Sequence, residues 1–218
     1  MYRYVLFDLD GTLTDPGVGI TNSVMHALTA YGITVGDRSE LYSFIGPPLD
    51  ESFMKYFGFK KEECPALITK FREYFHDRGI FENEVYAGVP EMLEKLKKAG
   101  YTLILATSKP QEYAERILCR FGLREYFTFV AGATFDESRV RKADVIAYAL
   151  GELGIRDISS CIMVGDREHD IIGAAANGMD AVGVLYGYGS REELDASGPV
   201  FLADTPETLA DFIKGTRK

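Results

Sequence analysis

The sequence predicts an α/β protein in which a parallel-sheet core carries an inserted helical subdomain. Short apolar runs recur along the chain, and each is followed by a polar or glycine-containing turn and then by a helical pattern. This alternation is typical of parallel sheets covered by helices. One long interval, from about residue 18 to residue 81, has helical patterns and no convincing strand.

Five apolar runs have the length of buried strands. They are Tyr4–Phe7, Thr102–Ala106, Phe127–Ala131, Cys161–Val164 and Ala181–Val184. Four segments with helical periodicity accompany them, and the first has a proline near its start and Gly100 just after its end. These segments are Pro90–Ala99, the stretch from near Pro110 to near Gly122, Ala143–Leu150 and Asp170–Asn177.

The interval between the first two strands is too long for a simple crossover. It contains three helical segments, Ile20–Tyr31, Leu49–Phe57 and Glu62–Arg78, separated by Gly32, by Gly46-Pro47-Pro48 and by Gly58. We interpret it as an inserted helical subdomain with hinges near residues 15–17 and 82–88. The predicted organisation is a core of residues 1–16 and 83–218 and a helical insert of residues 17–82.

The composition is that of an ordinary globular protein, with 46% hydrophobic and 26% charged residues in a chain of 218. A net charge of −9 argues against a nucleic-acid-binding surface, which needs clustered basic residues. Cys64, Cys119 and Cys161 are scattered and are interpreted as free thiols in a reducing compartment. No signal-peptide pattern or membrane-length apolar stretch is found, so a cytoplasmic location without membrane contact is expected.

Polar side chains follow the predicted strands at the sheet edge where ligands bind in open parallel sheets. The first strand ends in Asp8-Leu9-Asp10-Gly11-Thr12, the second in Thr107-Ser108-Lys109, and the fourth in residues 165–170, Gly-Asp-Arg-Glu-His-Asp. A basic run, Arg139-Val140-Arg141-Lys142, follows the third strand at the start of a helix. Three carboxylates, a hydroxyl and an ammonium group are therefore expected at one edge of the sheet.

This combination of groups fits phosphoryl transfer. Mg²⁺ prefers oxygen ligands, and Asp8 and Asp166 offer carboxylates whose mutual repulsion a cation relieves. A carboxylate can attack phosphorus, and Asp10 can protonate the leaving oxygen and then activate water. Thr107 and Lys142 would hold the transferring oxygens. Two of the three histidines lie in the helical insert, so neither a histidine nucleophile nor a zinc site is expected.

Four blocks of the sequence resemble, in order along the whole chain, the motifs of the haloacid-dehalogenase superfamily. They are FDLDGTLTD at residues 7–15, LILATSK at 103–109, Lys142, and MVGDREHD at 163–170. The helical insert resembles the C1 cap of this superfamily, and the overall pattern resembles its phosphoglycolate-phosphatase-like members. The resemblance implies an α/β fold with a five-stranded, Rossmann-like parallel-sheet core and a mobile, all-helical cap that closes over it.

The resemblance also implies a role for each matching residue. Asp8 would be the nucleophile and a metal ligand, and Asp10 the general acid and base, with its backbone carbonyl on Mg²⁺. Thr107 would contact phosphate together with the Ser108 backbone N–H, and Lys142 would orient nucleophile and phosphate. Asp166 would be a metal ligand, and Asp170 a ligand or a partner of one. Arg139 and Arg141 lie close to Lys142, but the helix that continues after it favours Lys142.

Several of these residues also have purely structural interpretations. Thr107 and Ser108 could cap the helix that begins at Pro110. Asp166 and Asp170 could be charges favoured at a helix N-terminus. Lys109 could touch substrate or be solvated, and the glycine-rich turn at residues 186–189 could border the site. Gly46-Pro47-Pro48 could reach over the site or could be a helix-to-helix turn.

The predicted function is a Mg²⁺-dependent phosphatase that hydrolyses a small phosphomonoester through an aspartyl-phosphate. Phosphoglycolate, a nucleoside monophosphate (the 5′-nucleotidase reaction) or a sugar phosphate would be the substrate. The partner is thus a small phosphorylated metabolite, with no nucleic-acid polymer, and the protein a monomer or homodimer.

Other functions remain open or are disfavoured. Hydrolysis of pyrophosphate and a β-phosphoglucomutase-like transfer to sugar are alternatives. Dehalogenation is disfavoured because relatives of that type lack the second aspartate, which is Asp10 here. Phosphonate cleavage would need a desolvated cap lysine, and nothing around Lys55, Lys60 or Lys61 indicates one. A non-enzymatic binding protein is disfavoured because every expected catalytic position is filled.

Overall fold

The computed structural model describes residues 1–136 and 138–216. By its internal contacts the chain divides into two compact units, residues 1–14 with 85–218 and residues 15–84. Two short strands, β2 (Thr14–Asp15) and β3 (Glu84–Val85), pair at the two places where the chain passes from one unit to the other. The units are described in turn.

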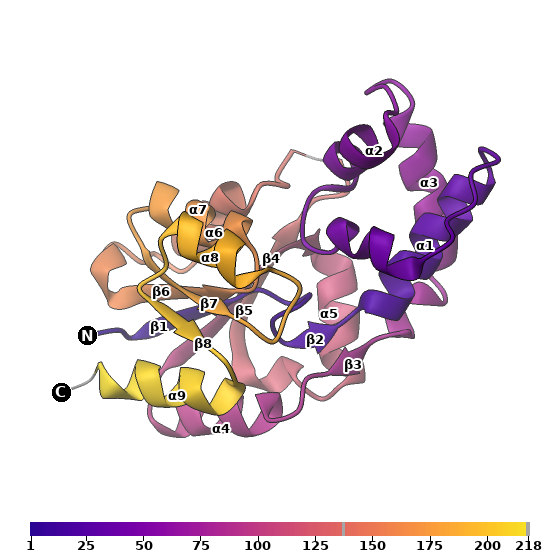
Figure 1. The fold of residues 1–218 in the computed structure, drawn as a ribbon. Helices are drawn as coiled ribbons and strands as arrows, with labels where there is room; N and C mark the ends of the chain where they lie inside the picture. Colours follow the sequence, from indigo (N-terminus) through magenta and orange to yellow (C-terminus); the bar gives the residue numbers. More distant parts are fainter. Residues whose placement is uncertain (137, 217–218) are drawn as a thin grey trace. The chain divides into compact units, whose positions relative to one another are not determined.

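The first unit is built on a six-stranded parallel sheet in the order β5-β4-β1-β6-β7-β8 (Figure 1). The strands are β1 (Tyr4–Phe7), β4 (Thr102–Pro110), β5 (Phe127–Ala133), β6 (Cys161–Gly165), β7 (Asp180–Val184) and β8 (Phe201–Ala203). The expectation of five strands was wrong by one, because the edge strand β8 has three residues and is only partly buried. The second predicted strand also continues beyond Ala106, through the residues expected to form its terminal turn.

Helices cover both faces of this sheet. They are α4 (Val89–Lys98), α5 (Gln111–Arg120), α6 (Lys142–Glu152), α7 (Glu168–Ala176), α8 (Arg191–Ser197) and α9 (Pro206–Gly215), with short 3₁₀ turns η3 (Arg124–Tyr126) and η4 (Ile158–Ser160). Figure 1 shows α6 and α7 on one face, and α4 with α9 on the other. Helix α4 has Gly88 before its first residue, a proline in its first turn and three lysines in its last. Proline fits the first turn because its missing N–H would have no partner there, and the lysines interact favourably with the negative end of the helix dipole.

One hydrophobic core cluster lies between the sheet and helices α6 and α7. Leu6, Ile104 and Met163 come from three adjacent strands and pack with Val145 and Ile171 of these helices. The strands are buried on both sides, so they read as continuous apolar runs rather than as alternating patterns. Their parallel register aligns Phe7 with Leu105 and Val164, so the residues that follow these strands meet at one edge.

The second unit is helical. It consists of α1 (Gly17–Thr29), η1 (Arg38–Phe44), α2 (Leu49–Phe57), α3 (Cys64–Phe75) and η2 (Gly79–Phe81). Helix α1 approaches η2 so closely that a Cβ on Gly19 would lie 1.9 Å from the carbonyl oxygen of Gly79. Residues 46–48 connect η1 to α2, so the helix-to-helix turn is present locally.

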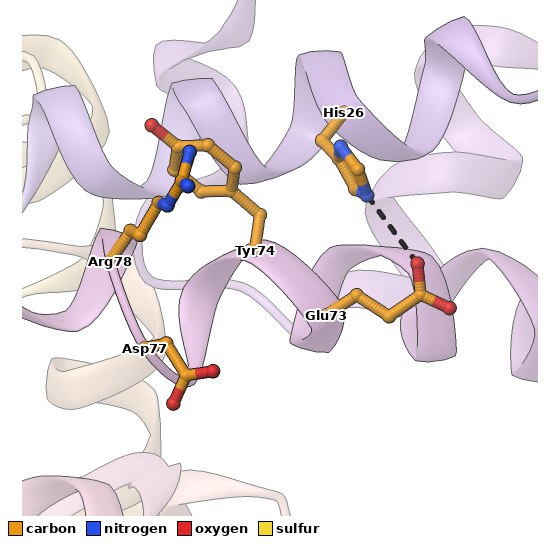
Figure 2. A pocket seen from close by; sticks show the side chains of 5 residues that line it. All are labelled: His26, Glu73, Tyr74, Asp77 and Arg78. Atoms are coloured by element: carbon orange, nitrogen blue, oxygen red, sulfur yellow. Dashed lines mark hydrogen bonds and ion pairs between the residues drawn. The ribbon is translucent and has the colours of Figure 1, made fainter.

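A shallow hollow of about 460 Å³ lies on this unit between α1 and the end of α3. His26, Glu73, Tyr74, Asp77 and Arg78 line it, and Figure 2 shows the imidazole of His26 directed at the Glu73 carboxylate. The two groups are 3.4 Å apart, and both side chains are almost half exposed. An exposed pair of this kind contributes little stability. Among the described residues, no helix is both long and apolar enough to cross a bilayer.

Candidate active site

The end of β1 places two carboxylates at the edge of the sheet. The backbone N–H of Asp8 still donates to Val164 in β6, at 2.9 Å, so Asp8 extends the strand. The chain then turns back, with the N–H groups of Leu13 and Thr14 donating to the carbonyl of Leu9. Gly11 has a φ of +81°, which only glycine adopts without strain.

Two further carboxylates follow β6. Asp166 accepts a 2.8 Å hydrogen bond from the N–H of Tyr188 and a longer bond, 3.3 Å, from the hydroxyl of Thr12. Asp170 lies in the first turn of α7 and accepts from the N–H of Arg167 at 3.2 Å. The helix-terminal interpretation therefore holds for Asp170. It does not exclude another role, because a carboxylate has two oxygens.

Glycines allow the chain to approach Asp166 closely. A Cβ on Gly11 would lie 2.1 Å from its Oδ2, and Cβ atoms on Gly187 and Gly189 would lie 2.4 and 2.0 Å from Asp166 atoms. The glycine-rich turn after β7 thus borders the acidic cluster. A side chain at Gly11 or Gly187 would displace the buried side chain of Asp166, and one at Gly189 would collide with its backbone carbonyl oxygen.

Lys142 is the first residue of α6 and lies inside the acidic cluster. Its Nζ is 2.8 Å from Oδ1 of Asp8 and 2.9 Å from Oδ1 of Asp170, and it donates to the carbonyl of Ala106 at 3.0 Å. The ammonium group thus has as many close oxygens as it has N–H bonds, two from carboxylates and one from the backbone. Burial opposes the charged form, but Asp170 and Asp8 together raise the pKa of Lys142 above its ordinary value.

The segment Thr107–Lys109 lies within β4, where the pairing with β5 shifts register between Ala106 and Pro110. Irregularities of this kind redirect side chains and are frequent next to active sites. Thr107 is buried, and its Oγ1 accepts from the N–H of Lys109 at 3.2 Å. The N-cap residue of α5 is Pro110, and no side chain caps this helix end. The capping interpretation of Thr107 and Ser108 was therefore wrong.

Lys109 forms an ion pair with Asp10 through Nζ and Oδ2, and both side chains are buried. It is therefore not the solvated residue that the sequence left possible. The signal that could have found it is the strand pattern: Thr107 and Lys109 are two residues apart, as are side chains on one face of a strand.

Burial raises the pKa of three carboxyl groups at this site, Asp10, Asp166 and Asp170. Burial raises the pKa of Asp166 well above its usual range, and the charges of Asp170 and Asp8 add to this. Burial also raises the pKa of Asp170, although Lys142 opposes the shift. Burial raises the pKa of Asp10 in the same way, against the opposing charge of Lys109. In all three the first cause is burial, which disfavours the charged form of a carboxyl group.

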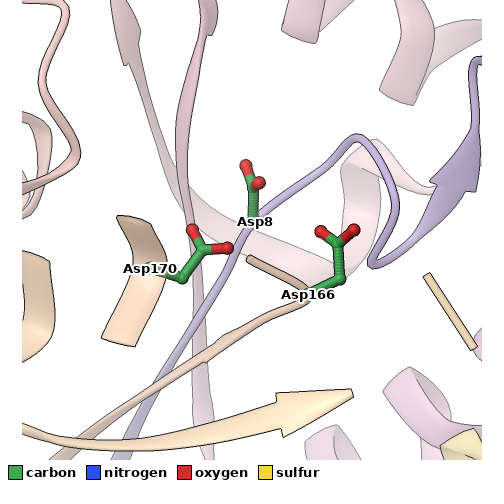
Figure 3. A group of neighbouring side chains, drawn as sticks. All are labelled: Asp8, Asp166 and Asp170. Carbon is green, nitrogen blue, oxygen red and sulfur yellow. The ribbon is translucent and has the colours of Figure 1, made fainter. Parts of the chain in front are cut away.

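The donor set fits a divalent cation. Carboxylate oxygens of Asp8, Asp166 and Asp170 lie within 4.8 Å of one another, and Figure 3 shows the three side chains gathered around one space. All charged side chains that are buried in the described chain belong to this site: Asp8, Asp10, Lys109, Lys142, Asp166 and Asp170. Four carboxylates against two ammonium groups leave two negative charges, which one hard divalent ion would neutralise.

The structure thus brings Asp8, Asp10, Lys142, Asp166 and Asp170 together at one edge of the sheet. Thr107 and Ser108 lie in β4, the strand next to β1, and the Thr107 hydroxyl accepts from the backbone N–H of Lys109. Sequence reasoning left the role of Lys109 open and did not assign one to Thr12. A hydroxyl such as that of Thr12 gives no sequence signal, because its partner Asp166 is 154 residues away.

Comparison with known proteins gives relatives that differ in reaction. A 5′-nucleotidase of Pseudomonas aeruginosa is 43% identical over 91% of this chain and 89% of its own length. Tyrosine-protein kinase PtkA of Mycobacterium tuberculosis is 41% identical over 88% of this chain, which spans 65% of that relative. Pyrophosphatase PpaX of Bacillus velezensis is 34% identical over 94% and 93% of the two chains.

A solved structure and a family model both match most of this chain. A predicted phosphatase from Clostridium acetobutylicum superposes with a TM-score of 0.96 and 44% identity, over 99% of each chain. The family model of the haloacid dehalogenase-like hydrolases matches residues 5–184, which include all the acidic residues of the cluster. This chain is therefore an enzyme of the haloacid dehalogenase-like hydrolase family.

Proposed function

We propose that this protein is a Mg²⁺-dependent phosphatase that hydrolyses a small phosphomonoester through an aspartyl-phosphate. One observation carries the proposal: all charged side chains buried in the described chain converge on one sheet edge, with two negative charges in excess. Burying unpaired charge is costly, so a fold keeps it where a charged ligand is bound. A metal ion with a phosphoryl group is a ligand of this kind.

Asp8 is the proposed nucleophile. One of its oxygens is held by Lys142, which fixes the carboxylate at the end of β1. Attack of the other oxygen on phosphorus breaks the bond to the leaving oxygen, and Asp10 supplies the proton that this oxygen needs. Water then attacks the aspartyl-phosphate, with Asp10 taking its proton, and Asp8 and inorganic phosphate are released.

The remaining residues hold the reacting groups. Lys142 offsets negative charge on Asp8 and the phosphoryl oxygens, and Thr107 with the Ser108 N–H is proposed to bind those oxygens. Asp8, Asp166 and Asp170, with the backbone carbonyl of Asp10, would hold Mg²⁺. The ion would supply positive charge at the phosphoryl group and between the carboxylates. Asp170 accepts from the N–H of Arg167 and forms an ion pair with Lys142, so it would act either as a direct ligand or as a partner of one.

The substrate class rests on the relatives. The 5′-nucleotidase relative favours a nucleoside monophosphate, and phosphoglycolate or a sugar phosphate would use the same chemistry. The pyrophosphatase relative makes pyrophosphate the second candidate. As part of this proposal, the helical unit, with the turn at residues 46–48, closes over the site and selects the substrate. We also propose a cytoplasmic location, in keeping with the free thiols of Cys119 and Cys161.

The test is a phosphate-release screen of the purified protein with Mg²⁺. The panel holds phosphoglycolate, nucleoside 5′-monophosphates, sugar phosphates and pyrophosphate, and sugar products are analysed for isomerisation. We expect free phosphate from a monoester, no release in excess chelator, and recovery on adding Mg²⁺. Phosphate retained on an isomerised sugar would replace hydrolysis by a mutase reaction.

Asp8→Asn is the variant that tests the nucleophile. It should abolish phosphate release and leave the fold intact, whereas Asp211→Asn, an exposed aspartate on α9, should behave as wild type. Retained turnover in Asp8→Asn would remove the covalent mechanism from the proposal.

A further inference from the structure

The pair formed by Lys109 and Asp10 is buried in the first unit. The side chains are 6% and 11% exposed, and they are 99 residues apart in the chain. Taking two charges out of water costs free energy that the attraction between them does not always recover. A pair retained under these conditions needs another reason, and fixing the geometry of a reacting group is one.

The two oxygens of Asp10 are in different situations. Oδ2 is held by the Lys109 ammonium, whereas Oδ1 is buried and accepts no hydrogen bond from the described residues. The carboxyl group is thus held on one side and available on the other. An acid that delivers a proton must present one oxygen at hydrogen-bond distance from the leaving oxygen.

The second buried lysine does not do this work. Lys142 forms ion pairs with Asp8 and Asp170 and donates to the carbonyl of Ala106, so its ammonium group already has three oxygen neighbours. The two lysines therefore divide the carboxylates of the β1 turn between them, with Asp8 on Lys142 and Asp10 on Lys109. We propose that Lys109 is a positioning residue that holds Oδ2 of Asp10 and so leaves Oδ1 to carry the proton of the reaction.

Thr107, the predicted phosphate contact, is hydrogen-bonded to the same segment as Lys109. Its hydroxyl accepts from the backbone N–H of Lys109, so both residues belong to one bonded segment of β4. The register shift after Ala106 lets this segment direct two buried side chains at the site. In this proposal one short segment of β4 provides both the phosphate contact, through Thr107, and the residue that positions the acid, Lys109.

The test uses two esters with different leaving groups, and it rests on the proposed phosphatase function. p-Nitrophenyl phosphate releases a stable phenolate that needs little help from an acid. AMP or phosphoglycolate, whichever the wild type hydrolyses faster, releases an alkoxide that must be protonated. Displacement of the acid should slow the alkyl ester about 100-fold, and the nitrophenyl ester by about threefold or less.

Lys109→Met removes the ammonium group and keeps the length of the side chain. The rates compared are kcat/KM values, which cover only the steps up to departure of the leaving group. Hydrolysis of the aspartyl-phosphate, in which Asp10 also acts, is the same for both esters and does not enter this quantity. We expect the split between the two esters for Lys109→Met and for Asp10→Asn, and no added loss when Lys109→Met is placed in the Asp10→Asn background. Lys109→Arg should recover a large part of the alkyl-ester rate. Lys98→Met, at an exposed lysine of α4, is the control and should leave both rates unchanged.

Each result decides between the possibilities. Equal loss on both esters, or a further loss in the Asp10→Asn background, would overturn the inference and place Lys109 on the phosphoryl group or in folding alone. If Lys109→Met does not fold, the same comparison is made with Lys109→Gln, and the same split is required. A wild-type enzyme that hydrolyses neither ester contradicts the proposed function. A wild type that does, with the split seen in Asp10→Asn alone, contradicts only the role of Lys109.

Discussion

Lys142 is the residue on which the balance of buried charge depends most. It contacts two carboxylates, Asp8 and Asp170, at 2.8 and 2.9 Å, and its side chain is 4% exposed. Removing one partner of a buried ion pair leaves the other charge uncompensated in a medium of low polarity. The same contacts that orient the nucleophile therefore also stabilise the fold.

We predict that Lys142→Met lowers the free energy of unfolding by about 3–5 kcal/mol in metal-free buffer. Urea unfolding at pH 7.5 measures this. Lys98→Met is the matched control, because Lys98 is 76% exposed and pairs with Glu94 on the same helix; its effect should stay within about 0.5 kcal/mol. Equal effects of the two substitutions would show that the buried contacts of Lys142 are not needed for stability.

At the scale of the element, the turn after β1 places the carboxylates. The strand fixes Asp8 by its ladder bond to Val164, and Gly11 then reverses the chain at a φ of +81°. The same glycine gives Asp166 room, because an added Cβ would lie 2.1 Å from its Oδ2. Gly11 thus serves the backbone and the acidic cluster at the same time.

We predict that Gly11→Ala abolishes phosphate release and weakens Mg²⁺ binding in a folded protein, because the new methyl group must displace the Asp166 carboxylate. Gly178→Ala separates this effect from backbone strain. Gly178 has a similar φ of +70°, and its added Cβ would meet nothing within 4 Å. Both variants should lose about 1–2 kcal/mol through the left-handed backbone, as measured by thermal unfolding.

Only the variant at Gly11 should lose Mg²⁺ binding in titration calorimetry. Wild-type binding in Gly11→Ala would show that Asp166 can move without consequence for the metal.

At the scale of the whole molecule, buried negative charges repel one another and lower the stability of the metal-free fold. The chain carries a net charge of −9, and two uncompensated negative charges lie buried at the sheet edge. Exposed charges are screened by salt, whereas buried ones are screened much less. The protein without metal therefore retains repulsion that salt does not remove.

We predict that Mg²⁺ raises the thermal unfolding temperature and that NaCl at equal ionic strength does not. Binding to the folded state alone contributes about 2.7 kcal/mol at a hundredfold excess over the dissociation constant. Scanning calorimetry with chelator, with Mg²⁺ and with NaCl measures the difference. Asp166→Asn should reduce the Mg²⁺ effect and raise the stability of the metal-free protein, because it removes one of the repelling charges. An equal response to NaCl would argue against a specific site.

The sequence by itself determined the layered α/β organisation and the helical character of residues 17–82. Continuous apolar runs are sufficient for this, because a parallel strand buried on both faces has no polar alternation to obscure it. The positions of Asp8, Asp10, Asp166 and Asp170 after their strands followed from the same rule, since the carboxyl ends of parallel strands meet at one edge. The strand β8 was not predicted, because three edge residues, two of them only partly buried, carry too little apolar pattern.

The tertiary structure decided the pairing of charges. The local sequence does not indicate that Lys109 pairs with Asp10. It also does not indicate that Lys142 pairs with Asp8 and Asp170. These choices depend on strand register and on the irregularity in β4, which are set by packing across the sheet. Residue types and their order therefore determined which chemistry meets at the edge, and the geometry of the assembled sheet determined which lysine holds which carboxylate.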